Sequence, residues 1–348
     1  YDVLPAFWTI SHIASLDFMI ILGVIALSLI STFFNSKGST SNRVEIARIE
    51  EDRFSEFLSR ASQPLAIDGG MSTELEQQGC KLEGSLWTAQ ALLDSPELIE
   101  SAHKAYVDAG AGVVITASYQ ISRAGFVEAG FTAEDADRAL RASIDVARKA
   151  VAGTDTLVAA SVGPYGAILH DGSEYKGNYG RTLEELRDFH AERLEVLVSA
   201  NPDLLAIETI PDALEAKALI AALENFPTAT AWMSFSIGPD GKLWAGQSLT
   251  EAAQIAAGSP AIAAIGVNCV DPALVSAAIA EIRSVTSLPV VIYANGGGTW
   301  NSESGVWENA AADALVAYSG QWVEQGATLI GGCCGTHAGD IRQLAEAL

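Results

Sequence analysis

From residue 64 to the last residue, short apolar runs alternate with longer stretches in which apolar and polar residues are mixed. Each run is rich in Val, Ile and Ala and is apolar at nearly every position, which is typical of strands buried on both faces. Eight such runs predict eight strands, with the ranges 65–70, 112–120, 156–164, 204–209, 228–237, 262–270, 289–296 and 327–335.

The mixed stretches between these runs carry the signals of helix ends. Ser95 precedes one stretch and Gly110 follows it, as expected of an N-cap and a C-terminal glycine. Thr182-Leu-Glu-Glu opens another stretch with the pattern of a capping box. We therefore expect helices over residues 96–109, 132–152, 182–199, 212–223, 250–257, 272–285, 310–325 and 340–348.

Eight β–α repeats within residues 61–348 predict an α/β fold of the (β/α)8 TIM-barrel type. A doubly wound open sheet is the alternative. It would usually place a glycine-rich phosphate loop after the first strand, and Asp68-Gly69-Gly70-Met71-Ser72 lacks that spacing. Function in such a barrel lies at the carboxyl ends of the strands, so these ends are where chemistry is expected.

The first sixty residues follow a different pattern. Residues 18–34 contain no charged side chain, and as a helix they would span roughly 26 Å, close to the hydrocarbon thickness of a bilayer. Residues 35–43 predict a linker, and residues 44–60 predict a charged amphipathic helix that leads into the barrel. We expect two domains: a hydrophobic N-terminal segment at residues 1–60, and the barrel at residues 61–348.

The apolar segment has two interpretations, and both stay open. As a transmembrane anchor it would leave the barrel in the cytoplasm, because acidic residues precede it and the residues that follow include Lys37, Arg43, Arg48 and Arg53. The chain begins with tyrosine, so the segment could instead come from a fusion or a wrongly assigned start.

Composition and charge exclude some functions. The 348-residue chain has a net charge of −23, which disfavours binding to the phosphate backbone of nucleic acids. Its four cysteines are too few for a small domain held together by disulfides, so we expect reduced thiols in a reducing compartment. Cys80 lies away from the predicted strand ends, and we expect no function for it.

The other three cysteines fall at the ends of two predicted strands. Cys269 ends the sixth strand, and Cys333 and Cys334 end the eighth. Three thiolates at one barrel mouth, with a fourth position left open, suit Zn²⁺. Neighbouring side chains on a regular strand point to opposite faces, and the flanking glycines would let the adjacent pair escape that rule. The alternatives are three buried structural thiols or a vicinal disulfide.

A metal would determine the chemistry of this mouth. A thiol is mostly protonated at neutral pH, and zinc coordination leaves a nucleophilic thiolate. A methyl group on a cationic sulfur or nitrogen is a suitable electrophile for it. Asp68 and Glu208 lie at the ends of the first and fourth strands, where substrates would bind, although each could equally cap a helix.

The same strand ends carry a resemblance to a known family. Over about residues 64–348 the chain resembles the zinc-dependent homocysteine S-methyltransferases. The motifs that carry the resemblance are Asp68-Gly-Gly-Met-Ser-Thr-Glu-Leu75, Thr116-Ala-Ser-Tyr-Gln120, Gly163-Pro-Tyr-Gly166, Asp171-Gly-Ser-Glu-Tyr175, Glu208-Thr209, Gly266-Val-Asn-Cys269 and Gly331-Gly-Cys-Cys-Gly-Thr336.

The resemblance implies a methyltransferase barrel that makes methionine from homocysteine. The implied zinc ligands, which are also the catalytic residues, are Cys269, Cys333 and Cys334. The homocysteine sulfur would complete the tetrahedron. The implied substrate-binding residues are Asp68 and Glu208, which would hold the amino group, and Gly69, Tyr119 and Asn268. The methyl donor would be S-methylmethionine or S-adenosylmethionine.

Two departures from the family pattern lie at the mouth. Gly335 follows the cysteine pair where many relatives have arginine, and residues 295–298 lack a proline before Asn295 and a Ser-Gly-Glu after it. The aromatic candidates for a cationic donor, each of which could equally be a packing residue, are Tyr119, Tyr165, Tyr175 and Trp300.

Other functions stay open as well. One is a betaine-type enzyme or one with another thiol or selenol acceptor. Another is a membrane-tethered binding protein that has kept the site without turnover. Neither the methyl donor nor the oligomeric state is specified by the sequence.

Overall fold

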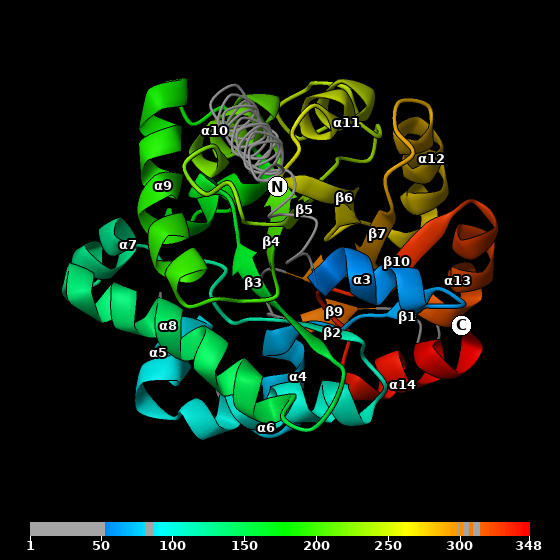
Figure 1. Cartoon of the computed structure of the whole chain (residues 1–348), viewed down its shortest axis with the longest axis horizontal. Coiled ribbons are helices and arrows are strands. Elements are labelled where there is room, and N and C mark those ends of the chain that lie inside the picture. The colour runs from blue at the N-terminus through cyan, green and yellow to red at the C-terminus, as the bar shows by residue number, and fades with distance from the viewer. Residues whose placement is uncertain (1–52, 81–86, 298, 302–305, 309–313) are drawn as a thin grey trace, which may run out of the picture. The chain divides into compact units, whose positions relative to one another are not determined.

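A computed structural model describes residues 53–80, 87–297, 299–301, 306–308 and 314–348. Eight parallel strands form one sheet in the order β1-β10-β7-β6-β5-β4-β3-β2. A bridge between Ile67 and Val113 joins the first strand to the second, so the sheet closes into the barrel of Figure 1. The predicted (β/α)8 TIM barrel is confirmed. Its strands are β1 (Leu65–Ala66), β2 (Val113–Ile115), β3 (Leu157–Val162), β4 (Leu204–Ile210), β5 (Ala231–Phe235), β6 (Ile262–Asn268), β7 (Val290–Ala294) and β10 (Ala327–Gly332).

Helices surround the strands (Figure 1). The capping box at the start of the helix after β3 forms as expected, because Glu185 N–H donates to Thr182 Oγ1 at 3.2 Å and Thr182 N–H donates to Glu185 Oε2 at 2.8 Å. The helices are α4 (Met71–Gln77), α5 (Trp87–Asp94), α6 (Pro96–Asp108), α7 (Arg123–Glu128), α8 (Ala133–Ala150), α9 (Leu183–Ser199), α10 (Ala213–Leu223), α11 (Leu249–Ala257), α12 (Pro272–Arg283), α13 (Ala314–Glu324) and α14 (Ala338–Ala347).

Several elements differ from the expected ones. Helices α4, α5 and α7 were not predicted, nor was the antiparallel pair β8 (Thr299–Asn301) and β9 (Val306–Glu308) between β7 and α13. The strands are shorter than the apolar runs, as β2 illustrates. Beyond Ile115 the chain turns, Thr116 and Ser118 pair their hydroxyls at 2.8 Å, and Ser118 Oγ donates to Ser161 O at 2.8 Å. Side-chain hydrogen bonds thus replace the strand ladder at the barrel mouth.

The side chains inside the barrel change from apolar to polar along each strand. Ala159 on β3 and Leu204 and Ala206 on β4 belong to the interior core, and two residues further on the inward positions hold Ser161 and Glu208. Successive side chains of a strand alternate between faces, so every second residue contributes to the interior. The apolar half of the barrel therefore supports a polar half at the carboxyl ends.

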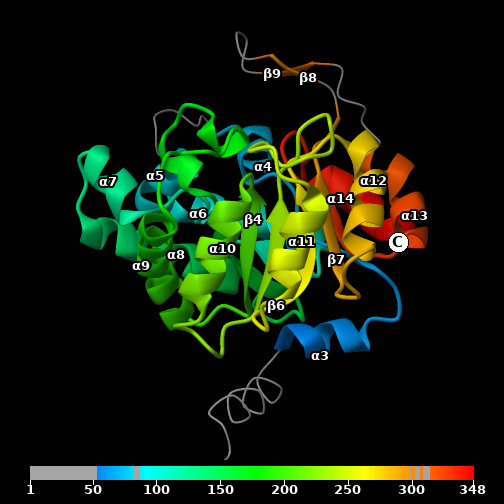
Figure 2. The ribbon, with the colours of Figure 1, turned by 90° about the horizontal axis from the view of Figure 1, so that it is seen from above.

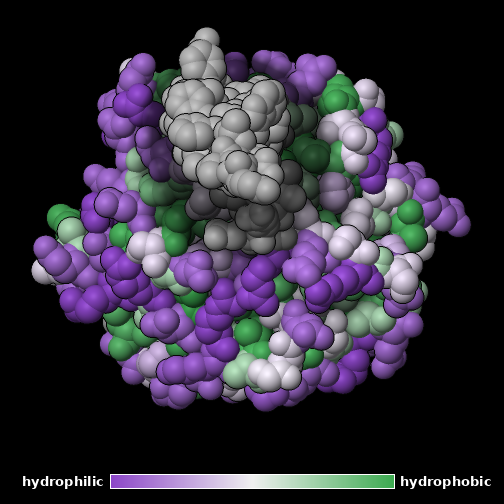
Figure 3. All heavy atoms as spheres, viewed as in Figure 1, coloured by the Kyte–Doolittle hydropathy of each residue, from purple (hydrophilic) through white to green (hydrophobic). Residues whose placement is uncertain are grey.

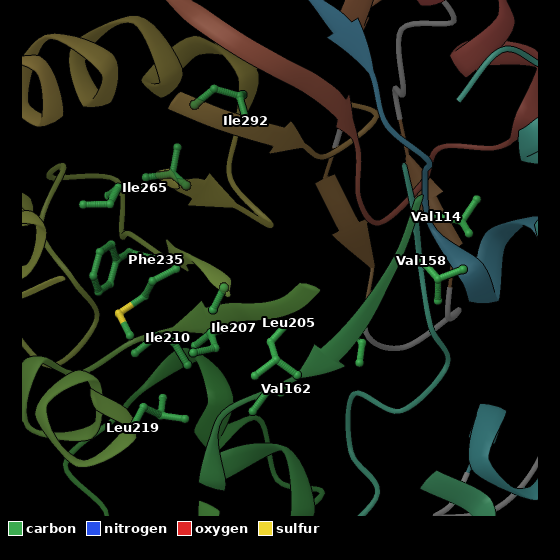
Figure 4. Packing of buried hydrophobic residues seen from close by; sticks show 14 of the residues in the cluster. Val114, Val158, Val162, Leu205, Ile207, Ile210, Leu219, Phe235, Ile265 and Ile292 are labelled. Carbon is green, nitrogen blue, oxygen red and sulfur yellow. The ribbon is translucent and has the colours of Figure 1, made fainter. Parts of the chain in front are cut away.

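The intervening strand positions face the helices. Figure 4 shows Val114, Val158, Leu205, Ile207 and Ile265 among the side chains packed in this outer layer. All five are at most 1% exposed. Strands that are apolar on both faces are expected in a barrel, because the interior and the helix layer each need a buried face.

Helix α3 (Arg53–Arg60) packs against the end of the barrel at which the strands begin (Figure 2). Phe54 is fully buried within the interior core, and its ring centroid lies 6.2 Å from that of Trp232. Arg53 forms an ion pair with Asp203, just before β4. Although we assigned this helix to the segment before the barrel, Asp52–Leu348 forms one compact unit.

The apolar segment 18–34, the linker 35–43 and the start of the expected helix 44–60 lie outside the described residues, so the membrane anchor stays a prediction. Within the described part of the chain, no helix combines the length and the apolar character needed to cross a bilayer. Hydrophilic residues cover most of the coloured surface in Figure 3, and apolar ones are scattered among them.

Candidate active site

Three thiols converge at the carboxyl ends of two strands, as the sequence predicted. Cys269 directly follows β6, and Cys333 and Cys334 directly follow β10. The Sγ atom of Cys269 lies 3.1 Å from that of Cys333 and 3.5 Å from that of Cys334. All three sulfurs lie within 4.8 Å of one another. This spacing lets one ion contact all three.

The backbone leaves regular strand geometry to bring the sulfurs together. Cys269 adopts a φ of 52°, in the left-handed region that residues other than glycine rarely enter. After the adjacent pair, Gly335 has a φ of 77°, and Thr336 N–H donates to Cys333 O at 3.2 Å. Cys333 and Cys334 therefore sit in a turn and not on a strand, which allows both side chains to face Cys269.

The thiols share their protons in this arrangement. Hydrogen bonds with Cys269 and Cys333 lower the pKa of the Cys334 thiol. The hydrogen bond between Cys333 and Cys269 raises the pKa of the Cys333 thiol. The pKa values of these two neighbouring thiols therefore shift in opposite directions. A soft divalent cation would satisfy all three sulfurs at once, and the donor set fits zinc chemistry.

Two buried carboxylates lie at the ends of β1 and β4. Asp68 is 2% exposed; its Oδ2 accepts the N–H of Ile115 at 2.6 Å, and its buried Oδ1 accepts no hydrogen bond within the described residues. Burial raises the pKa of Asp68, the hydrogen bond from Ile115 lowers it, and the charge of Glu208 raises it again. An unpartnered buried oxygen beside a second carboxylate is suited to a cationic ligand.

Glu208 is 7% exposed and accepts a hydrogen bond from Ser161 Oγ. Burial raises the pKa of Glu208 to about 7, against hydrogen bonds from Ser161 and Tyr293 that lower it. In the described residues neither Glu208 nor Asp68 forms an ion pair with a basic side chain. Both carboxylates thus remain free to bind an ammonium group.

The other predicted substrate residues occupy different surroundings. Gly69 packs closely, since a Cβ atom there would meet Thr336 Oγ1 at 2.8 Å. The Asn268 amide is engaged with Thr209, whose N–H donates to Asn268 Oδ1 at 2.7 Å and whose Oγ1 accepts from Nδ2 at 2.8 Å. Thr209 itself has a φ of 59°. Asn268 therefore holds the end of β4, directly after Glu208, in its left-handed turn.

Tyr119 lies in the turn after β2, where its ring packs so closely on Gly163 that a Cβ atom there would meet it at 2.6 Å. The Tyr119 carbonyl accepts from Nη2 of Arg193 at 3.0 Å. Arg193 is 2% exposed, and burial lowers its pKa to about 10. A buried arginine behind the mouth was not predicted, because on α9 it follows no pattern that separates it from surface arginines.

The aromatic candidates for binding a cationic donor lie in different surroundings. Tyr175 OH lies 3.2 Å from Cys269 Sγ, so this residue borders the cysteine cluster. Tyr165 instead packs against Tyr179 and Phe189, with ring centroids 5.3 and 5.0 Å away. Trp300 lies in β8.

Trp244 was missed by the sequence analysis. It packs edge-on against Tyr175, with ring centroids 6.5 Å apart. The residue lies in the loop between β5 and α11, beyond the predicted strand, which ends at residue 237. Its position could have indicated a role in ligand binding, because it is a tryptophan in a polar, glycine-rich loop at the functional end of a barrel.

The fold and the site together define a (β/α)8-barrel protein with a cluster of three thiols that could hold a metal ion, beside buried carboxylates. The family model for homocysteine S-methyltransferases matches residues 65–348. Homocysteine S-methyltransferase from Escherichia coli is 42% identical, over 80% of this chain and 94% of the relative. Selenocysteine Se-methyltransferase from Brassica oleracea is 38% identical, over 84% of this chain and 91% of the relative.

Comparison with solved structures leads to the same family. The homocysteine methyltransferase MmuM from Escherichia coli in its metallated form is similar with a TM-score of 0.77 and 40% identity, over 85% of this chain and 100% of that one. The chain therefore belongs to the homocysteine S-methyltransferase family and is an enzyme of the methyltransferase class.

Proposed function

We propose that this enzyme transfers a methyl group from a sulfonium donor to the sulfur of homocysteine, with zinc bound by Cys269, Cys333 and Cys334. The observation that carries the proposal is the cluster of three sulfurs within 4.8 Å, at the same barrel mouth as two buried, unpaired carboxylates. A thiol and an ammonium group on one substrate would engage both features. Homocysteine carries both groups, and the family name supports it.

Different residues of the site would bind different parts of the substrate or keep the site in shape. Asp68 Oδ1, which lacks a partner in the described residues, and Glu208 would accept hydrogen bonds from the ammonium group. When bound, zinc would lower the pKa of the substrate thiol so that it is ionised at neutral pH. Asn268 would keep the strand end that carries Glu208 in place through Thr209. Gly69 would let the chain beside Asp68 pack closely on Thr336.

The acidic character of the mouth favours a cationic donor. Asp68 and Glu208 would be engaged by the ammonium group of homocysteine, whereas Glu174 adds a further carboxylate that interacts with Cys269, and thiolate ligands add negative charge. A sulfonium donor such as S-methylmethionine or S-adenosylmethionine brings positive charge and a good leaving group. Betaine is the alternative cationic donor. A selenol acceptor is the alternative substrate, and the Brassica relative favours including it in the test.

The test combines metal analysis with methyl transfer. We expect about one zinc ion per chain in protein purified under reducing conditions, and homocysteine-dependent methionine formation with S-methylmethionine, S-adenosylmethionine or both. Betaine and selenocysteine serve as the competing donor and acceptor. Full zinc loading without transfer from any donor would indicate a binding protein without turnover and would contradict the proposal.

A further inference from the structure

Trp244 is exposed at the barrel mouth although it is held in place. The side chain is 41% exposed, and its Nε1–H donates to Ser236 Oγ at 3.0 Å just beyond β5. The ring is therefore fixed by a hydrogen bond through its nitrogen and is exposed over part of its surface. A large aromatic ring that is fixed by its polar end and exposed over its face offers a contact surface to a ligand.

Two aromatic rings connect this surface to the cysteine cluster. The Trp244 ring meets the Tyr175 ring edge-on, at 74° and 6.5 Å between centroids. Tyr175 OH lies 3.2 Å from Cys269 Sγ. A group bound against these rings would therefore lie next to the sulfur cluster. The position is the one that a methyl donor must occupy to reach an acceptor thiol at the same cluster.

Glu174 adds negative charge at the same place. It precedes Tyr175 in the short helix η2 (Ser173–Tyr175), and its Oε2 atom is buried without a hydrogen-bond partner in the described residues. An unpartnered buried carboxylate oxygen is costly unless a ligand satisfies it. The charge of Glu174 also interacts with Cys269, so the carboxylate lies near the cysteine cluster. A cationic group placed there would compensate the negative charge, which a neutral thioether would not do.

Hydrogen bonds between loops hold the two rings in this arrangement. Ala245, next to Trp244, donates its N–H to Pro211 O at 3.0 Å in the loop after β4. The carbonyl of Ala245 accepts from Asn178 Nδ2 at 3.3 Å, in the loop that carries Tyr175. Three loops are thereby tied together, and these hydrogen bonds help to fix the spacing of the two rings.

We propose that Trp244, Tyr175 and Glu174 form the seat for the cationic group of the methyl donor. The inference rests on the proposed methyl transfer and names the residues that select the donor. Aromatic faces attract cations, and the attraction disappears when the sulfonium becomes a thioether. The seat would thus bind the donor and release its demethylated product, because only the donor carries the charge.

Binding measured without homocysteine tests the seat directly. Isothermal titration of the zinc-loaded enzyme compares S-methylmethionine with methionine, and S-adenosylmethionine with S-adenosylhomocysteine. We expect at least one sulfonium to bind about tenfold or more tightly than its thioether. Trp244→Leu should weaken sulfonium binding about 5- to 30-fold and leave thioether binding within about twofold. Trp244→Phe, which keeps an aromatic face, should retain most of the preference.

Glu174→Gln keeps the shape of the side chain and removes its charge, and it should also reduce the preference for the sulfonium. Val127→Ala is the control, since Val127 is 57% exposed and lies on α7, outside the loops that carry Glu174, Tyr175 and Trp244. Zinc content and thermal unfolding of each variant check that the fold is retained. A wild-type enzyme without sulfonium preference, or a Trp244→Leu enzyme that keeps it, would overturn the inference.

Methyl transfer measured in parallel separates this inference from the proposed function. Transfer to homocysteine with a sulfonium preference that ignores Trp244 would overturn the seat and leave the proposed function standing. A Trp244-dependent preference without any methyl transfer would support the seat and contradict the proposed function.

Discussion

Phe54 closes the amino-terminal end of the barrel, and we predict that Phe54→Ala strongly destabilises it. Its side chain is fully buried against the interior core, beside Trp232. A buried aromatic side chain removes roughly 150–250 Å² from water, which corresponds to roughly 4–6 kcal/mol at about 25 cal/mol per Å². Alanine retains part of this, so we expect a loss of about 3–5 kcal/mol in the free energy of unfolding.

Urea denaturation followed by tryptophan fluorescence measures this loss, and Trp232 is a reporter in direct contact. Glu56→Ala, an exposed position on the same helix, is the matched control and should change the free energy of unfolding by less than about 0.5 kcal/mol. The active site lies at the opposite end of the barrel, so zinc content in the folded variant should be unchanged.

A chain that begins at residue 61 should be less stable than one that begins at residue 52, because it lacks Phe54 and the Arg53–Asp203 ion pair. A loss below about 1 kcal/mol for Phe54→Ala would refute the reasoning.

Three further predictions concern the site. Cys333→Ala should lose most bound zinc and nearly all methyl transfer, as measured by metal analysis and methionine formation, and full zinc occupancy in a Cys269→Ala, Cys333→Ala double variant would contradict the assignment. Glu208→Gln should weaken homocysteine binding by roughly 1.5–3 kcal/mol with zinc retained, and unchanged affinity in a titration would show that the carboxylate has another role. The Glu208 pKa of about 7 predicts that homocysteine affinity falls as the pH drops below 7, because the protonated carboxyl no longer attracts an ammonium group. Glu208→Gln should flatten that part of the pH profile, and an equal slope in both proteins would count against Glu208 as its source.

Much of the fold and the cluster of three cysteines could be predicted from the sequence, because both follow local rules. Apolar runs at regular spacing specify strands and helices through burial, and eight repeats leave few arrangements other than a barrel. Cys269 and the Cys333–Cys334 pair lie at strand ends, and the parallel strands of a barrel all end at one mouth. Asp68 and Glu208 were found by the same rule.

Only the tertiary structure showed the features that depend on contacts between distant segments. The sequence predicted an amphipathic helix that includes Phe54, but only the tertiary structure showed that Phe54 fills the amino-terminal end of the barrel. Cys269 reaches its partners through a left-handed turn that its own residue type disfavours and that surrounding hydrogen bonds must hold. Glu174, Tyr175 and Trp244 come from loops after different strands, and they share one surface because hydrogen bonds between those loops fix their paths. Periodicity records which face of an element is buried, whereas loop paths depend on the packing of the whole barrel.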